Sequence, residues 1–232
     1  MEERLTDQEI VRRQKVEKLK ELGIDPFGQA YERTHYSQDI KDLVAGKSNE
    51  EVEAMDLHVS IAGRIMFIRK MGKASFFSIQ DLKGKQQIYI SINDLGEESY
   101  ELFKMADVGD IVGVKGKVML TRTGEPTVKC LEYTHLTKAL RPLPEKFHGL
   151  TDKEERYRRR YVDLIMNEEA KRVAIARPRI IRAIQEYCDS LGFIEVETPV
   201  LQANQGGATA RPFITHHNSL DKEFYLRIQF YL

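Results

Sequence analysis

The chain has 232 residues, with 36 basic and 36 acidic side chains and therefore no formal net charge. Hydrophobic residues at 41% and charged residues at 31% are typical of an ordinary globular protein, which excludes a disordered or membrane-spanning chain. Balanced charge argues against a protein that coats nucleic acid indiscriminately, although a small excess of lysine and arginine lies in residues 57–140. The two cysteines are far apart without metal-ligand spacing, and no signal-peptide pattern follows Met1, so we expect a cytoplasmic protein.

The first predicted element is a helix that begins at a capping box. The Thr6 hydroxyl can accept the amide proton of Glu9 while the Glu9 carboxylate reaches back, and Gly23 is a natural C-terminal stop. The apolar side of this helix carries Ile10, Val16, Leu19 and Leu22. Its charged side has two interpretations: a solvated helix packed on the next domain, or contact with RNA through Arg12, Arg13 and Lys15. From residue 31 to 56 we expect a polar connection with one short helix near residues 50–55.

From residue 58 onward, hydrophobic residues recur at every second position, which predicts strands. The first strand carries Val59, Ile61, Ile65 and Phe67, with a bulge or bend at Gly63. A second strand carries Phe77 and Ile79, a hairpin connection follows at 81–85, and a third strand carries Ile88 and Ile90. A short helix at 97–105 precedes a fourth strand at 111–120, a turn at 123–126 and a fifth strand ending at 136. Three strands, a helix and two further strands are the order of a five-stranded OB-fold barrel.

Prolines at 142 and 144 predict a stiff linker after the barrel. The predicted parts are an N-terminal helical extension (1–56), an OB-fold domain (57–140), a linker (141–150) and the start of a second domain (151–232). The second domain opens with a basic helix around 156–164, whose arginines we interpret as solvated or salt-bridged. A long helix follows from 168 to 191, with a kink or a new helix start at Pro178. Gly192 ends that helix, and we expect a strand over 193–201, interrupted by Pro199.

The barrel segment carries candidate nucleic-acid contacts. An OB-fold binds single strands by combining basic side chains for phosphate with exposed aromatic rings on which bases stack. Phe76 and Phe77 are consecutive, so they point to opposite faces of their strand and only one can enter the core. Candidate polar contacts are Arg69, Lys70 (a phosphate contact), Lys73, Gln80, Gln86, Gln87 and, at the last turn, Glu125. A glutamine offers both a donor and an acceptor, which reading a base edge requires. From the residues alone, base recognition and ordinary barrel packing both remain open.

Several stretches resemble bacterial-type lysyl-tRNA synthetase, a class II enzyme, over nearly the entire chain. They are residues 11–15, 23–28, 71–76, 138–144, 146–150, 206–208 and 211–218. The resemblance implies a mixed α+β and all-β fold, in which an N-terminal helix and an OB-fold barrel precede the start of an antiparallel-sheet catalytic domain. It also implies ATP-dependent ligation of lysine to tRNA-Lys, with ATP and Mg²⁺ as cofactors of the full-length enzyme and no membrane partner.

The resemblance assigns roles to four barrel residues. Phe76 matches the aromatic residue that stacks on an anticodon base of tRNA-Lys. Arg69 and Gln87 match the pair that recognises the central uridine, and Glu125 matches an acid that contacts a neighbouring anticodon base.

The resemblance also covers the second domain. Residues 191–199, with Gly192, Phe193 and Pro199, fit the first class II motif, which builds the homodimer interface. Gly206 matches a glycine that borders the lysine pocket.

The resemblance is incomplete at the end of the chain. The two further class II motifs, which hold ATP, have no counterpart before Leu232, so we expect no catalytic residues and a chain that is inactive alone. We also expect exposed apolar surface around Phe224, Tyr225 and Ile228. The adjacent His216 and His217, without further ligands, do not predict a metal site. A non-catalytic OB-fold RNA-binding module and a dimerisation or interaction fragment are the alternative functions.

Overall fold

The computed structural model describes residues 5–28, 30–144, 150–207 and 209–228. The chain divides into two compact units, the barrel unit (Met1–His148) and the second unit (Gly149–Leu232), and each is described by itself. Part of the predicted linker, residues 145–149, lies outside the described residues. So do Ala208 in the predicted lysine-pocket loop and the final four residues.

Helix α1 (Asp7–Glu21) begins at the predicted capping box. The Thr6 hydroxyl accepts a hydrogen bond from the Glu9 amide, and the Glu9 carboxylate accepts one from the Thr6 amide at 2.9 Å. Gly23 follows the helix with φ of +73°, a conformation that favours glycine. The buried residues of α1 are Arg12, Val16 and Leu19, whereas Ile10 and Leu22 are exposed. The helix therefore packs through a narrower stripe than the sequence predicted.

Two helices, rather than the single one expected, occupy the connection before the barrel. Helix α2 (Ser37–Val44) buries Ile40 and Val44, and helix α3 (Asn49–Ala54) buries Val52. All three side chains join the barrel core. The expected polar connection is therefore wrong for α2, whose two apolar residues lie four positions apart, the spacing of neighbours on one helix face.

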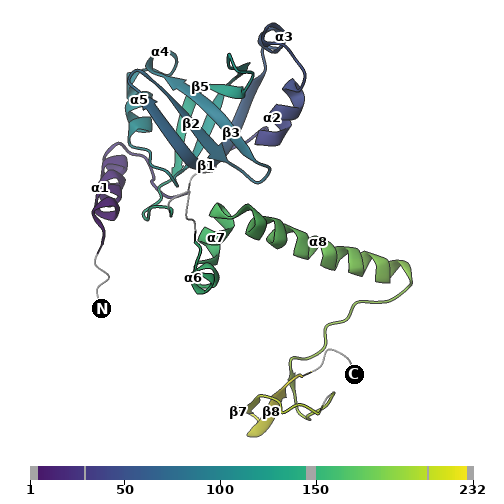
Figure 1. Cartoon of the computed structure of the whole chain (residues 1–232). Helices are drawn as coiled ribbons and strands as arrows, with labels where there is room; N and C mark the ends of the chain where they lie inside the picture. Colours follow the sequence, from purple (N-terminus) through teal and green to yellow (C-terminus); the bar gives the residue numbers. More distant parts are fainter. Residues whose placement is uncertain (1–4, 29, 145–149, 208, 229–232) are drawn as a thin grey trace. The chain divides into compact units, whose positions relative to one another are not determined.

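Five strands close into a barrel in the order β1-β2-β3-β5-β4, with β1 also pairing with β4 (Figure 1). They are β1 (His58–Met71), β2 (Ala74–Gln80), β3 (Lys85–Ser91), β4 (Ile111–Leu120) and β5 (Pro126–Thr137). All neighbouring strands are antiparallel except β3 and β5, which are parallel. Helices α4 (Ile92–Leu95) and α5 (Glu97–Lys104) connect β3 to β4. The predicted OB-fold is confirmed.

The irregularity in β1 lies beyond the glycine that was expected to cause it. The pairing of β1 with β2 shifts register between Ile65 and Phe67, not at Gly63. One extra residue reverses the alternation of faces, so Phe67 is 51% exposed although the sequence pattern placed it with Ile65 inside. At Gly63 the carbonyl oxygen of Gln80 would lie 2.7 Å from an added Cβ, so close strand contact explains this glycine.

The barrel core is built from aliphatic side chains and three aromatic contacts. Phe77 lies against Phe103 of α5, with ring centroids 5.1 Å apart, and Phe103 also contacts Tyr100 and Tyr133. Helix α5 therefore closes the barrel from the side of β2 and β5 with its own aromatic residues. Rigid strands packed on this core fix the directions of the side chains on their outer faces.

The second unit contains three helices and a small antiparallel sheet. The helices are α6 (Lys153–Arg158), α7 (Arg160–Met166) and α8 (Glu168–Ser190), and the sheet has the order β6-β8-β7, with β6 (Leu201–Gln202), β7 (Ile214–His217) and β8 (Lys222–Leu226). Helix α8 runs without a break across Pro178, so no new helix begins there.

The strand expected over residues 193–201 is wrong except at its end. Only Leu201 belongs to a strand, β6, and Phe193–Val200 pairs with no strand in the described part of the chain. The segment is instead hydrogen-bonded to Arg227. The Arg227 amide donates to the Val200 carbonyl oxygen, and its guanidinium donates to Thr198. An apolar alternation becomes a strand only where a neighbouring ladder takes up its backbone groups.

Candidate nucleic-acid interface

The outer face of β1, β2 and β3 brings three of the four predicted barrel residues together. Arg69 on β1 lies opposite Phe76 on β2, and Phe76 lies opposite Tyr89 on β3. Gln87 lies two residues before Tyr89 on the same strand, on the same face, opposite Ser78. Directly opposite residues of antiparallel strands have Cβ atoms about 5 Å apart, and diagonal pairs such as Phe76 and Gln87 are about 7–8 Å apart, so these side chains are neighbours.

The two consecutive phenylalanines separate as predicted. Phe77 is 1% exposed in the core, whereas Phe76 is half-buried on the outer face. The Phe76 ring lies 5.1 Å from the ring of Tyr89, at an interplanar angle of 56°. The sequence reasoning missed Tyr89, although its position between Ile88 and Ile90 indicates that it faces outward.

Glu125 reaches the same region from a different element. It lies in the turn between β4 and β5, where its amide donates to the Thr121 hydroxyl at 3.0 Å, and its side chain is exposed. Two residues later, Thr127 pairs in parallel with Gln87. The turn therefore places the Glu125 carboxylate near the start of β3, the strand that carries Gln87.

The functional groups on this face are available for a ligand. Within the described ranges, the Arg69 guanidinium, the Gln87 amide and the Glu125 carboxylate make no hydrogen bond or ion pair. By contrast, Lys83 is paired with Asp39 at 2.6 Å and Lys115 with Glu132 at 2.7 Å. An exposed row of aromatic rings bordered by unpaired donors and acceptors is the arrangement that binds single-stranded nucleic acid.

Two other candidates on these strands have partners within the protein, and Lys70, which is exposed, stays a predicted phosphate contact. Gln86 is 1% exposed, and its Nε2 donates to the Pro126 carbonyl oxygen at 2.6 Å, which joins β3 to the start of β5. Lys70 Nζ donates to the Lys104 carbonyl oxygen near the end of α5 at 3.4 Å, so the Lys70 side chain is directed at a helix C-terminus. Adjacent glutamines therefore have different roles because successive residues of a strand face opposite sides.

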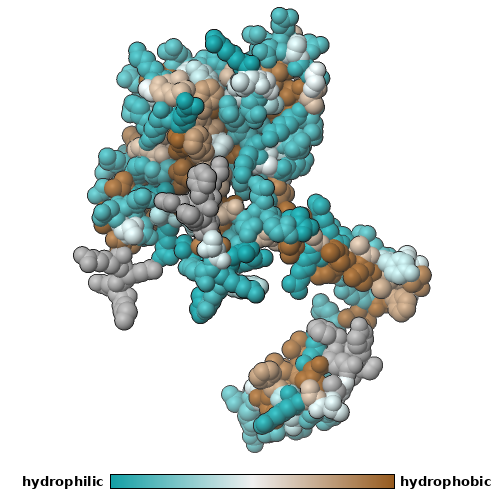
Figure 2. Space-filling view, in the orientation of Figure 1, coloured by the Kyte–Doolittle hydropathy of each residue, from teal (hydrophilic) through white to brown (hydrophobic). Residues whose placement is uncertain are grey.

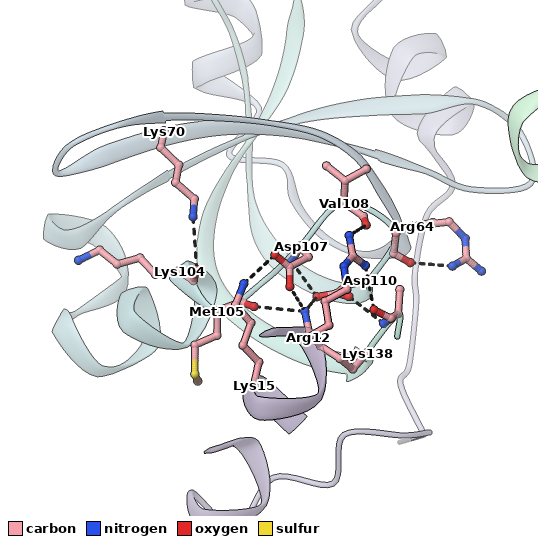
Figure 3. Close-up of polar contacts among 12 residues, drawn as sticks. Arg12, Lys15, Arg64, Lys70, Lys104, Met105, Asp107, Val108, Asp110 and Lys138 are labelled. Atoms are coloured by element: carbon pink, nitrogen blue, oxygen red, sulfur yellow. Dashed lines mark hydrogen bonds and ion pairs between the residues drawn. The ribbon is translucent and has the colours of Figure 1, made fainter. Parts of the chain in front are cut away.

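The basic residues of α1 hold the helix on the barrel (Figure 3). Arg12 donates to the carbonyl oxygens of Ala139 at 2.8 Å and Val108 at 3.0 Å, and Lys15 Nζ lies 2.7 Å from Asp107 Oδ1. The packed-helix interpretation is confirmed. Arg12 is too buried to contact RNA, and its donors are already used within the protein.

A buried lysine anchors this network. Lys138, at the end of β5, lies 2.6 Å from both Asp107 and Asp110, and its side chain is fully buried. Burial alone would raise the pKa of Asp107, but hydrogen bonds from Lys138 and Lys15 outweigh it and hold that pKa below its ordinary value. The network joins α1, the segment before β4 and the end of β5.

Comparison with known proteins identifies the family. A family model described as an OB-fold nucleic acid binding domain matches residues 59–136, and one described as class II tRNA synthetases (D, K and N) matches residues 152–232. The lysine–tRNA ligase of Lysinibacillus sphaericus is 57% identical to this chain over 226 residues, and those of Bacillus cytotoxicus and Bacillus anthracis are 54% identical over 226 residues. The chain belongs to the lysine–tRNA ligase family. Each comparison covers 97% of this chain and 45% of the relative, so the chain spans less than half the length of these ligases.

The part of the chain that matches the class II model, residues 152–232, presents an apolar helix face (Figure 2). The exposed apolar residues of α8 and the segment after it are Val173, Ile180, Ile181, Ile184, Tyr187, Leu191, Phe193, Ile194, Val196 and Val200. Gly192 ends α8 with φ of +86°. Exposed apolar surface was expected around Phe224, Tyr225 and Ile228, and these three side chains are half-buried. The residues of α8 and the segment after it are more exposed, so the larger apolar surface lies there.

The arginine-rich helices of this part are salt-bridged, as expected. Arg156 Nε lies 2.8 Å from one carboxylate oxygen of Asp163, and Arg160 lies 2.5 Å from the other. Asp163 itself is buried. These arginines therefore neutralise a buried acid between α6 and α7 and are partly used within the protein.

Other predicted features of the second unit are placed but not explained by the structure. Gly206 lies in the irregular loop between β6 and β7, where an added Cβ would meet nothing within 4 Å. His216 lies 3.2 Å from Asp221 Oδ1, and the ring of His217 lies 5.3 Å from that of Phe224. Across the described ranges, no group of three or more histidine, cysteine, aspartate or glutamate side chains could hold a metal ion.

Two remaining sequence features have simple structural outcomes. Cys130 is buried inside the barrel, and burial raises the pKa of its thiol to about 12, so the thiol stays protonated and unreactive. No helix in the described ranges combines the length and the apolar composition that crossing a membrane requires.

Proposed function

We propose that the outer face of β1–β3 binds the anticodon loop of tRNA-Lys, and that this chain supplies anticodon recognition to the ATP-dependent ligation of lysine to tRNA. The observation that carries the proposal is that Arg69, Phe76 and Gln87 share one face of the barrel. The guanidinium of Arg69 and the side-chain amide of Gln87 have no partner among the described residues. The proposal assigns residues 57–140 to anticodon binding and residues 151–232 to part of the catalytic domain.

Each of the four residues has a role that suits its chemistry. The exposed face of the Phe76 ring stacks on an anticodon base, which contributes about 1–3 kcal/mol. A uridine presents carbonyl acceptors and one N–H donor, so Arg69 donates to a carbonyl oxygen while Gln87 both donates and accepts. The Glu125 carboxylate, which only accepts, contacts a hydrogen-bond donor on a neighbouring base.

The second unit supplies the homodimer interface in this proposal. The exposed apolar face of α8, followed by Gly192, Phe193 and Pro199, supports association with a second copy of the chain, because contiguous apolar surface of this kind marks an interface. In the same proposal Gly206 borders the lysine pocket.

ATP and Mg²⁺ are the cofactors expected for the whole reaction, which takes place in the cytoplasm. The described residues offer no carboxylate cluster that fits Mg²⁺, so the proposal assigns none of them to the metal.

Binding of labelled anticodon stem-loops tests the proposal. A loop with the sequence UUU is compared with one whose central uridine is replaced by cytidine, at two salt concentrations. We expect the changed loop to bind about 1–3 kcal/mol more weakly, the value of a lost base-edge contact. Phe76→Ala should weaken binding of the UUU loop by a similar amount. Equal binding of both loops by the wild-type chain would contradict anticodon reading and leave only phosphate attraction.

A further inference from the structure

The proposed site uses one aromatic ring, but the row on which it lies continues. Tyr89 is opposite Phe76 on β3, and Lys129 is opposite Tyr89 on β5, so the order across four strands is Arg69, Phe76, Tyr89, Lys129. Two aromatic residues are therefore flanked by a cation on each side. The two aromatic residues of this row, Phe76 and Tyr89, are not part of the barrel core.

Tyr89 is not a core residue. Its neighbours on β3, Ile88 and Ile90, are fully buried, whereas Tyr89 is half-buried on the outer face. The ring of Tyr89 lies against the ring of Phe76, and within the described part of the chain its hydroxyl has no hydrogen-bond partner. Tyrosine usually finds a partner for its hydroxyl when it is buried, so an unpaired hydroxyl on this face remains available to a ligand.

Lys129 ends the row with a positive charge. It lies between two buried residues of β5, Val128 and Cys130, and therefore points outward. Its Nζ is 2.6 Å from Asp94 Oδ1, and its side chain is 38% exposed. The carboxylate fixes the position of the ammonium group without covering it, so donors of the ammonium group remain for a phosphate oxygen.

We propose that Tyr89 and Lys129 form a second nucleotide site, in which the Tyr89 ring stacks on the base next to the one on Phe76 and Lys129 contacts the phosphate of that nucleotide. This inference rests on the proposed function of the same face. The ligand is one unpaired nucleotide of a single strand. Stacking is tolerant of base identity, so this site adds affinity and sets the spacing of the loop without reading a sequence.

The geometry of the two rings determines how the loop is held. The rings are inclined by 56°, so two bases that stack on them cannot lie parallel to each other. Consecutive bases must therefore be splayed apart, each on its own ring, which exposes their edges to Arg69 and Gln87. Splayed bases on aromatic side chains are a general mode of single-strand RNA recognition.

A cycle of protein variants and abasic loops tests the inference. Tyr89→Ala should weaken binding of the UUU stem-loop about 10-fold, within the range for loss of one stacked base. Tyr89→Phe should bind within about twofold of wild type, because it keeps the ring. Against a loop that lacks the neighbouring base, Tyr89→Ala should cause almost no further loss. Tyr89→Leu, which keeps apolar bulk, should behave like Tyr89→Ala if its thermal unfolding matches that of wild type.

The charged end of the row is tested separately. Lys129→Gln should reduce the slope of log affinity against log salt concentration by about 0.7, the value of one phosphate contact to a single strand. Lys115→Gln is the matched control, because Lys115 is also a barrel lysine in an ion pair, with Glu132 at 2.7 Å, but lies on β4 outside the row. The control should leave the slope unchanged.

The outcomes separate this inference from the proposed function. If wild type distinguishes the central uridine but Tyr89→Ala binds as wild type does, the second site is wrong and anticodon reading stands. If Tyr89→Ala loses the same factor with every abasic loop, the ring does not hold a particular nucleotide and the inference also fails. If wild type does not distinguish the central base while the Tyr89 cycle shows coupling, the face stacks bases without reading the anticodon.

Discussion

The barrel unit and the second unit treat their apolar residues in opposite ways. In the barrel unit, Ile65 and Phe77 are no more than 1% exposed, and charged groups such as Lys138 are buried in paired networks. In the second unit, Ile180 is 60% and Ile194 is 85% exposed, and the buried hydrophobic residues of its described part are Val162 and Ala170. The barrel is therefore stabilised by contacts within itself, whereas α8 exposes an apolar face, which in the proposed function packs on a second copy of the chain.

Truncating one apolar residue in each unit tests this difference in burial most directly. Phe77→Ala should lower the free energy of unfolding of the barrel by about 3–5 kcal/mol, because it leaves a cavity in a packed core. Ile184→Ala, on the exposed face of α8, should change the free energy of unfolding of the second unit by no more than about 0.5 kcal/mol. Denaturant unfolding monitored by tyrosine fluorescence measures both. Similar losses for the two variants would mean that α8 is packed within the chain.

Removing the buried cation should have the next largest effect. Lys138→Ala leaves Asp110, which is fully buried, without its ion-pair partner at 2.6 Å. Breaking a buried pair in this way costs about 3–5 kcal/mol, with partial relief here because the Ala139 amide still donates to Asp110. The same unfolding measurement detects it. A loss below about 1 kcal/mol would show that the network is accessible to water.

The same network predicts a dependence of stability on pH. The folded state lowers the pKa of Asp107, so folding favours its ionised form. This contribution is fully present above the ordinary pKa, about 4, and is lost as the pH falls through the lowered folded-state value. Unfolding curves between pH 6 and 3 should show a loss of stability that is smaller in Asp107→Asn. An identical pH dependence in that variant would exclude Asp107 as the group responsible.

A surface ion pair on the barrel should have the smallest effect. Lys115 and Glu132 lie 2.7 Å apart on β4 and β5, and both side chains are more than half exposed. Their double-mutant cycle should give a coupling free energy of about 0.2–1 kcal/mol, which decreases with salt. A larger, salt-independent value would indicate that this pair is shielded from solvent.

The barrel could be predicted from sequence because its information is local. Alternating residues and turn residues specify each strand, and the order of strands and helix specifies the OB-fold. Phe76 and Phe77 could be assigned to opposite faces from their adjacency alone. The Arg69, Phe76 and Gln87 assignments came from the family resemblance, and the structure adds that these residues share one face.

What the sequence could not reveal depends on contacts between distant segments. The bulge that turns Phe67 outward is visible only in the pairing of β1 with β2. The alternation with Ile88 and Ile90 places Gln86 inward and Gln87 outward, but the hydrogen bond from Gln86 to Pro126 is visible only in the structure. The segment 193–200 has a strand pattern, but no ladder in the described chain pairs with it.

The central claim is that the face of β1–β3 reads the middle anticodon base through named side chains, and a discrimination ratio measures this most directly. The affinity for a UUU stem-loop is divided by that for a UCU stem-loop, in wild type and in Gln87→Ala. We expect a ratio of about 10 or more in wild type, equivalent to a lost base contact, and a ratio close to 1 in Gln87→Ala. Gln38→Ala, a change of the same residue type on α2, where Gln38 Nε2 donates to Asp42 at 2.8 Å, should keep the wild-type ratio. An unchanged ratio in Gln87→Ala would contradict the account.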